Sequence, residues 1–118
     1  MSKVVFINGQ SRDVADIVLG TAPCGFCCTV VPDDLGETEL LQQVSDADFL
    51  ILHPANICGK ILQNAKNLRH IQLLTAGYDK VDIVAATELG ITVATNGGAN
   101  AWAVAEQAIA LLLCLYRR

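Results

Sequence analysis

Positive charge is scarce in this sequence of 118 residues. Eight lysines and arginines stand against twelve aspartates and glutamates, so the formal net charge is −4 and the isoelectric point lies near 4.9. Proteins that bind nucleic acid or anionic membranes carry a basic patch, so we expect neither partner. Hydrophobic residues make up 53% of the chain and charged residues 17%, which indicates one densely packed domain over residues 1–118.

Two kinds of long hydrophobic segment are also missing. The N-terminus, "MSKVVFING", enters a strand-like run without the basic start and long apolar core of a secretory signal, so we expect a cytoplasmic protein. The apolar stretch over residues 101–116 is interrupted by Glu106 and Gln107 and is shorter than the roughly 20 residues that span a bilayer. It predicts a helix that protein covers on most sides, and no membrane segment.

The cysteines form no recognisable framework. Five cysteines are an odd number, and without an export signal we expect reduced thiols. The Cys24-x-x-Cys27 pair has the spacing of a redox pair or of half a zinc site. However, it leads into an apolar run instead of a helix, and no second Cys/His pair follows at ligand spacing. We therefore expect small, partly buried cysteines at the start of a strand, and no metal.

Short apolar runs alternate with helical spacing along the chain. Runs rich in Val, Ile and Leu predict five strands, at residues 3–8, 28–32, 48–54, 70–75 and 91–96. Helical spacing with Gly or Asn stops predicts helices at residues 13–20, 37–47, 59–67 and 82–90, the first of which fits a loop almost equally well. Near-continuous apolar strands between helices indicate a parallel sheet. We predict an α/β fold, a flavodoxin-like doubly wound five-stranded parallel sheet with helices on both faces.

Ligands of such sheets bind beyond the carboxyl ends of the strands. In "LLTAGYDKVD", Ala76 and Gly77 form a small turn before a helix that Asp79 or Asp82 can cap. Exposed backbone N–H groups at such a turn can hold a carboxylate or phosphate. From spacing alone, the simpler interpretation is that Gly77 only makes the turn.

The last loop, "NGGAN", repeats this arrangement, and Asn100 can cap the helix that starts at Ala101. It lacks the G-x-G-x-x-G spacing of a dinucleotide fingerprint and follows the fifth strand instead of the first. The loop after the first strand, "NGQSRD", offers only a modest phosphate cradle, which disfavours a flavodoxin-type mononucleotide binder. A dinucleotide is therefore not expected to bind through the "NGGAN" loop alone.

Two histidines flank the strands. His53 ends the third predicted strand at the rim where ligands bind, so it either contacts an anionic ligand, acts as a base, or is a surface histidine before a proline. His70 begins a strand at the opposite rim and is expected to be structural. A response-regulator receiver needs acidic residues where this chain has Asn8 and His53, which argues against that function. No Ser/His/Asp or Cys/His set is present.

The two loops and the last helix carry a family resemblance. "TAGYDKVD", "AATELGI", "GAN" and "AVAEQAIALLL", at their spacing within residues 67–117, resemble the substrate-binding domain of the NAD-dependent D-2-hydroxyacid dehydrogenases. That family includes formate, phosphoglycerate and glycerate dehydrogenases. The motifs are specific and cover about half of the chain, and "HPANI" and "AKNL" lean towards formate dehydrogenase. Gln107 departs from the A-E-H pattern usual in the family.

The resemblance implies roles for particular residues. Backbone amides at Ala76, Gly77 and Tyr78 would hold the substrate carboxylate, and Asn100 would reach formate. The start of the last helix, from Ala101 to Val104, would face the nicotinamide of NAD or NADP.

The resemblance also implies that much of the enzyme is absent from these residues. The family's G-x-G-x-x-G nucleotide domain, substrate-binding arginine, acidic partner and catalytic histidine all follow the segment that ends at Arg118. We expect the substrate-binding half of a D-2-hydroxyacid or formate dehydrogenase, truncated relative to the two-domain family. Alone it would be inactive and would bind no cofactor tightly, so whether it is an enzyme stays open.

In the family, the helix that matches residues 101–118 crosses between the two domains, which would account for its apolar character on all sides. Its expected partners are the missing nucleotide-binding domain and a second copy, in a homodimer through this helix. The alternative function is a non-catalytic binding or dimerisation module of the same fold. The family's C-terminal-binding-protein corepressors, which bind peptides through this domain, make that alternative plausible.

Overall fold

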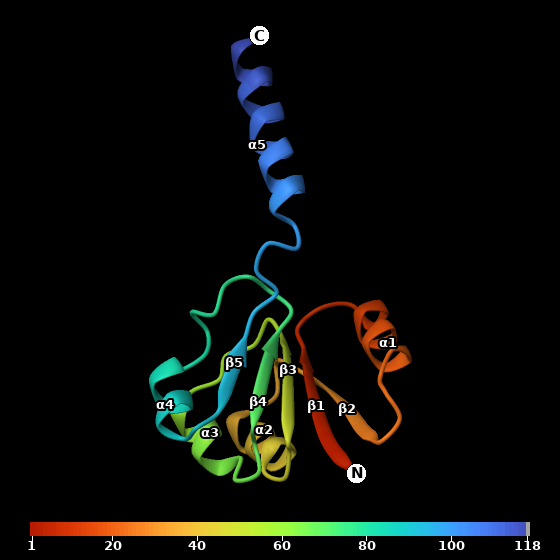
Figure 1. Cartoon of the computed structure of the whole chain (residues 1–118), viewed down its shortest axis with the longest axis vertical. Coiled ribbons are helices and arrows are strands. Elements are labelled where there is room, and N and C mark those ends of the chain that lie inside the picture. Colours follow the sequence, from red (N-terminus) through yellow and green to blue (C-terminus); the bar gives the residue numbers. More distant parts are fainter. Residues whose placement is uncertain (118) are drawn as a thin grey trace.

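A computed structural model describes residues 1–117 as five strands and five helices (Figure 1). The elements are β1 (Ser2–Asn8), α1 (Arg12–Gly20), β2 (Phe26–Pro32), α2 (Glu37–Val44), β3 (Phe49–His53), α3 (Gly59–Asn64), β4 (His70–Leu73), α4 (Ile83–Glu88), β5 (Thr92–Ala94) and α5 (Ala101–Tyr116). Every predicted element exists, and residues 12–20 are helix, not loop. Arg118, the last residue of the predicted final helix, lies outside the described residues.

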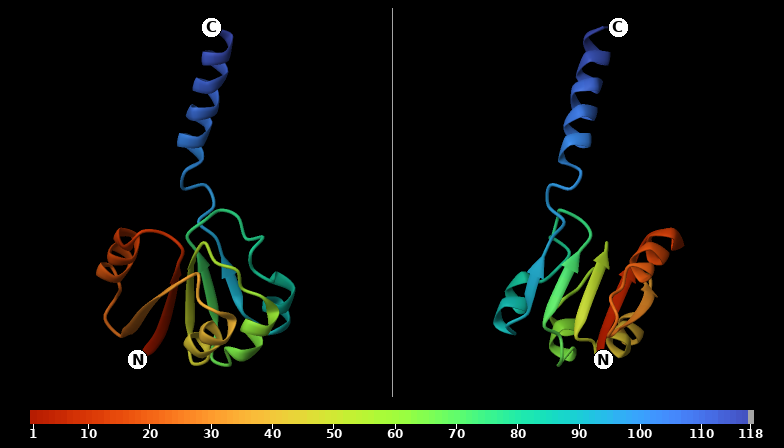
Figure 2. Two further views of the ribbon diagram at one scale, coloured as in Figure 1. Left: turned by 180° about the vertical axis from the view of Figure 1, so that it is seen from behind. Right: turned by 45° about the vertical axis from the view of Figure 1, so that its right-hand side comes forward.

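The strands form one parallel sheet in the order β2-β1-β3-β4-β5. This is the flavodoxin-like order, so the predicted α/β fold is confirmed. Right-handed crossovers place α1 on one face and α2, α3 and α4 on the other, because the chain moves first to one side of β1 and later to the opposite side. Seen from behind, α2 and α3 lie in front of the strands (Figure 2).

The main core lies between the sheet and α2, α3 and α4. Alternate strand residues point into it and are fully buried, among them Val5, Leu50 and Ile71. Leu40 and Val44 of α2 and Ile61 and Leu62 of α3 pack against them, with Ala86 of α4. The near-continuous apolar runs of the sequence predict strands that are buried in this way.

The opposite face of the sheet is only partly covered. The strand residues between those that enter the main core point to this face. On β1 they are buried, since Val4 and Phe6 are at most 5% exposed. On β3 the same register leaves Phe49 and Ile51 half-buried. Helix α1 lies over the β1–β2 half, and no described helix lies over the other half.

Helix α5 projects away from the sheet (Figures 1 and 2). None of its residues is buried, and the molecule is 56 Å long but only 24 Å thick. The sequence predicts protein cover for this helix, but the described residues of this chain supply none. The cover must come from outside the chain or from another arrangement of it, because exposed apolar patches of this size mark interaction surfaces.

Candidate functional site

The loops after β3 and β4 run side by side at the carboxyl edge of the sheet. Ile57 and Val81 form an isolated parallel bridge between them. The Ile57 amide donates to the Lys80 carbonyl at 2.8 Å, and the Asp82 amide donates to the Ile57 carbonyl at 3.0 Å. Asp82 also caps α4, because its carboxylate accepts a hydrogen bond from the Ala85 amide at 3.0 Å. These bonds hold both loops at the rim where ligands of parallel sheets bind.

Ala76, Gly77 and Tyr78 form an exposed bend at this rim. Within residues 1–117, their three amide groups donate to no other residue. The Thr75 hydroxyl donates to the Gly77 carbonyl at 3.0 Å and so restrains the bend. A β-carbon at Gly77 would lie 3.1 Å from Asp79 Oδ1, so a larger residue would crowd that carboxylate. Unpaired N–H groups at a restrained bend can bind an anion.

A small hollow of about 180 Å³ adjoins the bend. It is lined by Pro54, Ala55, Leu73, Thr75, Gly77, Asp79 and Lys80. Its volume equals that of roughly six waters at about 30 Å³ each, which suits an acid of a few heavy atoms. Lys80 supplies a cation and Asp79 an anion at its wall. Thr75 and Lys80 were missed as site residues, although they flank Ala76 and Gly77 in "TAGYDK".

His53 lies at the same edge but outside this hollow. Strand alternation turns its side chain to the α1 side of the sheet, with Phe49 and Ile51. Its Nδ1 is buried and has no hydrogen-bond partner among residues 1–117. Its backbone carbonyl accepts from the Gly9 amide at 2.6 Å. His53 therefore does not line the hollow, whereas the following residue, Pro54, does.

The first turn of α5, with Asn100 before it and Ala101 and Val104 in it, lies beyond the rim. The Asn96 amide donates to the Thr75 carbonyl at 3.0 Å, and after that bond the chain leaves the sheet. Within the described part of the chain, no hydrogen bond or hollow joins Asn100 to the bend at residues 76–78. The positions predicted to meet around a substrate are therefore split between the sheet edge and a projecting helix.

The sequence predicts side-chain caps for α4 and α5, and the structure shows one only at α4. The predicted side-chain cap by Asn100 is wrong, because its side chain makes no capping hydrogen bond and its backbone is close to helical, with φ −111° and ψ 12°. Its carbonyl instead accepts from the Val104 amide at 3.0 Å. For α4 the cap is Asp82, not Asp79.

The C-x-x-C segment forms a turn, not a helix start. The Phe26 amide donates to the Pro23 carbonyl at 3.4 Å, and Gly25 has a φ of +100°, which favours glycine. Cys24 and Cys27 are free and exposed, which corrects the expectation of partial burial for these two. Cys28 is partly buried.

His70 has the structural role expected of it. It begins β4, and its Nδ1 lies 2.7 Å from the Thr92 hydroxyl on β5. In residues 1–117 no three His, Cys, Asp or Glu side chains gather to hold a metal ion. The helices of the same residues are also too short or too polar to cross a bilayer.

Sequence comparison identifies relatives over most of the chain. D-3-phosphoglycerate dehydrogenase of Archaeoglobus fulgidus is 34% identical over 89 residues, which are 75% of this chain and 17% of that protein. Mitochondrial formate dehydrogenase of Solanum tuberosum is 37% identical over 92 residues, again 75% of this chain and 24% of the relative. The chain therefore spans only about a fifth of the length of these two relatives.

The fold is also that of solved dehydrogenases. The NAD⁺-bound 3-phosphoglycerate dehydrogenase of Entamoeba histolytica superposes with a TM-score of 0.76 at 25% identity, covering 94% of this chain and 38% of that one. The sequence profile of the family described as "D-isomer specific 2-hydroxyacid dehydrogenase, catalytic domain" matches residues 9–110. This range includes both rim loops and the first part of α5. The chain belongs to the D-isomer-specific 2-hydroxyacid dehydrogenase family.

Proposed function

We propose that this chain seats the carboxylate of a small acid in an NAD-dependent D-2-hydroxyacid or formate dehydrogenase. The observation that carries the proposal is the bend at Ala76, Gly77 and Tyr78. Its three amides are free of hydrogen bonds within residues 1–117 and adjoin a hollow of about 180 Å³. Backbone donors that are fixed before binding cost no reorganisation when a carboxylate arrives, and Lys80 adds positive charge.

Orientation is the main contribution of such a seat. Hydride transfer requires the reacting carbon to be held against a nicotinamide, and a fixed carboxylate limits how that carbon can lie. NAD supplies the hydride acceptor when it is bound. The relatives support NAD for the longer protein, since the Entamoeba structure contains NAD⁺.

The residues of this chain fit one side of a nicotinamide but not its phosphates. Ala101 and Val104 present small apolar side chains on the exposed first turn of α5, which suit contact with a flat ring. At the loop after β1, a β-carbon on Gly9 would overlap the Asp33 carboxylate. An acidic group at that position repels phosphate. We infer that a separate nucleotide-binding domain holds the dinucleotide and that the chain alone transfers no hydride.

The test is an NMR titration of the ¹⁵N-labelled chain with formate, glyoxylate and D-lactate. We expect saturable shifts of the Ala76, Gly77 and Tyr78 amides with at least one acid. Lys80→Ala should weaken that binding about tenfold, which corresponds to the lower end of the range for a charge-assisted hydrogen bond. The matched control is Lys60→Ala, because Lys60 pairs with Glu37 and neither residue lines the hollow. Shifts that spread evenly over the surface, or equal effects of the two variants, would contradict the proposal.

A further inference from the structure

A second hollow lies beside the one at the bend. It has a volume of about 290 Å³, and the loops after β2, β3 and β4 contribute to its lining. We call it the side hollow and define it by Asp33, Leu35 and Asn56, together with Pro54, Ala55 and Lys80, which line both hollows. The hollow at the bend lies towards β4 and the side hollow towards β1 and β2, so the loop after β3 runs between them.

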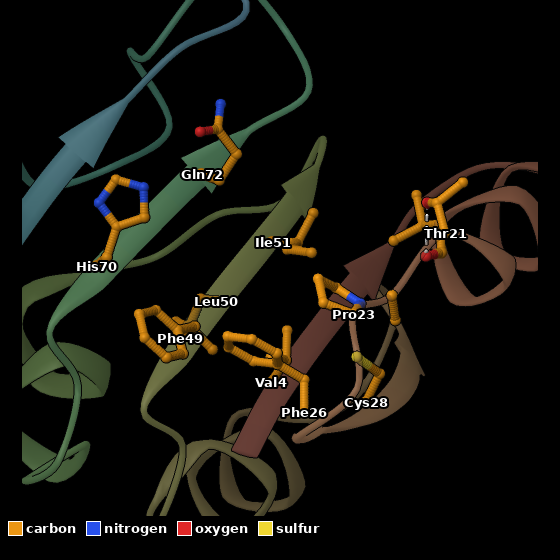
Figure 3. A pocket seen from close by; sticks show the side chains of 12 residues that line it. Val4, Thr21, Pro23, Phe26, Cys28, Phe49, Leu50, Ile51, His70 and Gln72 are labelled. Carbon is orange, nitrogen blue, oxygen red and sulfur yellow. Dashed lines mark hydrogen bonds between the residues drawn. The ribbon is translucent and has the colours of Figure 1, made fainter. Parts of the chain in front are cut away.

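The side hollow is within reach of an acid whose carboxylate lies at residues 76–78. Neighbouring strands are about 4.8 Å apart, and a chain of three bonds of about 1.5 Å each nearly covers that distance. Another hollow, of about 320 Å³, lies on the α1 side of the sheet, where Phe49 and Ile51 face the loop at Pro23 (Figure 3). It shares no lining residue with the hollow at the bend, so the same acid does not extend into it.

The loops after β1 and β3 fix the surroundings of Asp33. The Gly9 amide donates to the His53 carbonyl at 2.6 Å and so joins these two loops. The Asp33 carboxylate lies against Gly9, where a β-carbon would overlap it and would also lie 3.0 Å from the Pro54 carbonyl oxygen. The carboxylate is therefore close to Pro54, at the boundary between the two hollows.

The side hollow has one negatively charged wall. Glu37 also lines it, but its charge is offset by Lys60 at 2.6 Å. Asp33 makes no ion pair within residues 1–117. Lys80 is the only cation among the described residues that line the side hollow, and it also lines the hollow at the bend with Asp79. Once a carboxylate binds beside Lys80, the charge of Asp33 dominates the side hollow.

Charge, and not size, decides what the side hollow accepts. Its volume equals that of roughly ten waters at about 30 Å³ each, so a hydroxyl and a phosphoryl group both fit. A hydroxyl donates a hydrogen bond to a carboxylate, whereas a phosphate group carries about −1.5 to −2 charges and is repelled. At a separation of about 8 Å and an effective dielectric constant of about 40, each pair of like unit charges weakens binding about sixfold.

We propose that the side hollow receives the substituent next to the carboxylate of the substrate, and that Asp33 limits this substituent to an uncharged, hydroxylated group. The proposal rests on the carboxylate seat at residues 76–78 and names its substrate class. These substrates are small 2-hydroxy or 2-oxo acids that carry a hydroxyl on the substituent and no second anionic group. Asn56 adds an amide to the same lining. Asp33 is then a specificity-determining residue that does not contact the reacting carbon.

The first experiment titrates the ¹⁵N-labelled chain at constant ionic strength with four acids. Formate has no substituent, D-lactate has a methyl, D-glycerate a hydroxymethyl and 3-phospho-D-glycerate a phosphorylated hydroxymethyl group. D-glycerate should shift the amides of residues 76–78 and also the side-chain amide of Asn56. It should bind at least threefold more tightly than D-lactate and at least tenfold more tightly than 3-phospho-D-glycerate. Equal binding of D-glycerate and 3-phospho-D-glycerate, or no response of Asn56 to D-glycerate, would overturn the proposal.

The second experiment removes the charge or the hydrogen-bond acceptor of Asp33, which is exposed and tolerates substitution. Asp33→Asn keeps the shape of the side chain and should reduce the preference for D-glycerate over 3-phospho-D-glycerate at least fivefold. Asp33→Ala should lower the affinity for D-glycerate to that for D-lactate. The matched control is Asp34→Asn, since Asp34 is also exposed but does not line the side hollow, and it should change the preference less than twofold. Equal effects of Asp33→Asn and Asp34→Asn would refute a specific role for Asp33.

Formate separates this proposal from the carboxylate seat on which it rests. Because formate has no substituent, its shifts at residues 76–78 report on the seat alone and should change less than twofold in Asp33→Asn. If formate binds there while Asp33→Asn leaves the preference between the two glycerates unchanged, the seat stands and the role of Asp33 is overturned. If none of the four acids shifts these amides, both proposals fail.

Discussion

Asp79 and Asp82 lie three residues apart before α4, but their side chains do different things. Asp82 accepts the Ala85 amide, while Asp79 lies beside Gly77 at the hollow. The sequence allowed either to be the cap. A hydrogen bond to a specific amide depends on where the helix begins, and α4 begins at Ile83, one residue after Asp82.

We predict that Asp82→Ala lowers the free energy of unfolding by about 1 kcal/mol, the usual cost of losing an N-cap. Asp79→Ala should change it by less than about 0.5 kcal/mol, as an exposed position does. Urea unfolding followed by circular dichroism measures both. Equal losses in the two variants would show that Asp82 does not act through its cap.

Gly9 and Gly20 differ in the space around them. A β-carbon at Gly9 would overlap the Asp33 carboxylate and lie 3.0 Å from the Pro54 carbonyl oxygen, whereas nothing lies within 4 Å at Gly20. We predict that Gly9→Ala destabilises the fold by about 1–3 kcal/mol through this crowding. Gly20→Ala, at the end of α1, should be neutral or stabilise by up to about 1 kcal/mol. Thermal unfolding of both variants tests the difference, and an unaffected Gly9→Ala protein would contradict it.

At the scale of elements, the two faces of β3 have unequal cover. Leu50 is fully buried among α2, α3 and the sheet, while its neighbour Ile51 is half-buried on the α1 side of the sheet. The apolar run "FLIL" could not show this, because both residues have the composition of a strand buried on both sides.

We predict that Leu50→Ala costs about 2–5 kcal/mol, as full burial and a residual cavity require, and that Ile51→Ala costs less than half of that loss. Both are to be measured by urea unfolding. Similar losses at the two positions would mean that the two faces of β3 are equally covered in solution.

At the scale of the whole molecule, the rim loops and α5 are separated in space. Residues 76–78 belong to the sheet edge, whereas Asn100 immediately precedes α5, so the residues proposed to hold the substrate lie in two separate parts of the structure. In the proposed function, the missing organisation comes from a nucleotide-binding domain that contacts α5.

Trp102 is the single tryptophan of the chain and lies exposed on the first turn of α5, next to the residues proposed to face a nicotinamide. We predict that NADH causes no saturable change in its fluorescence below millimolar concentration, because the Asp33 carboxylate beside Gly9 repels phosphate at the loop after β1. N-acetyltryptophanamide at equal absorbance corrects for light absorbed by NADH. A saturable change at micromolar NADH would show that the chain binds the dinucleotide by itself.

The sequence alone determined the order of the elements, the parallel sheet and the family, because hydrophobic periodicity and loop motifs are local properties of a chain. The predicted boundaries are wrong where tertiary hydrogen bonds end an element. The fifth strand, predicted at residues 91–96, stops at Ala94, before the Asn96–Thr75 hydrogen bond. Only the tertiary structure decided which of two carboxylates caps α4, that Lys80 and Thr75 line the hollow, and that half of one sheet face is open. These depend on contacts between distant segments, which no periodicity encodes. The composition of α5 indicated that it needs cover, whereas the direction in which it leaves the sheet revealed that its own described residues do not provide that cover.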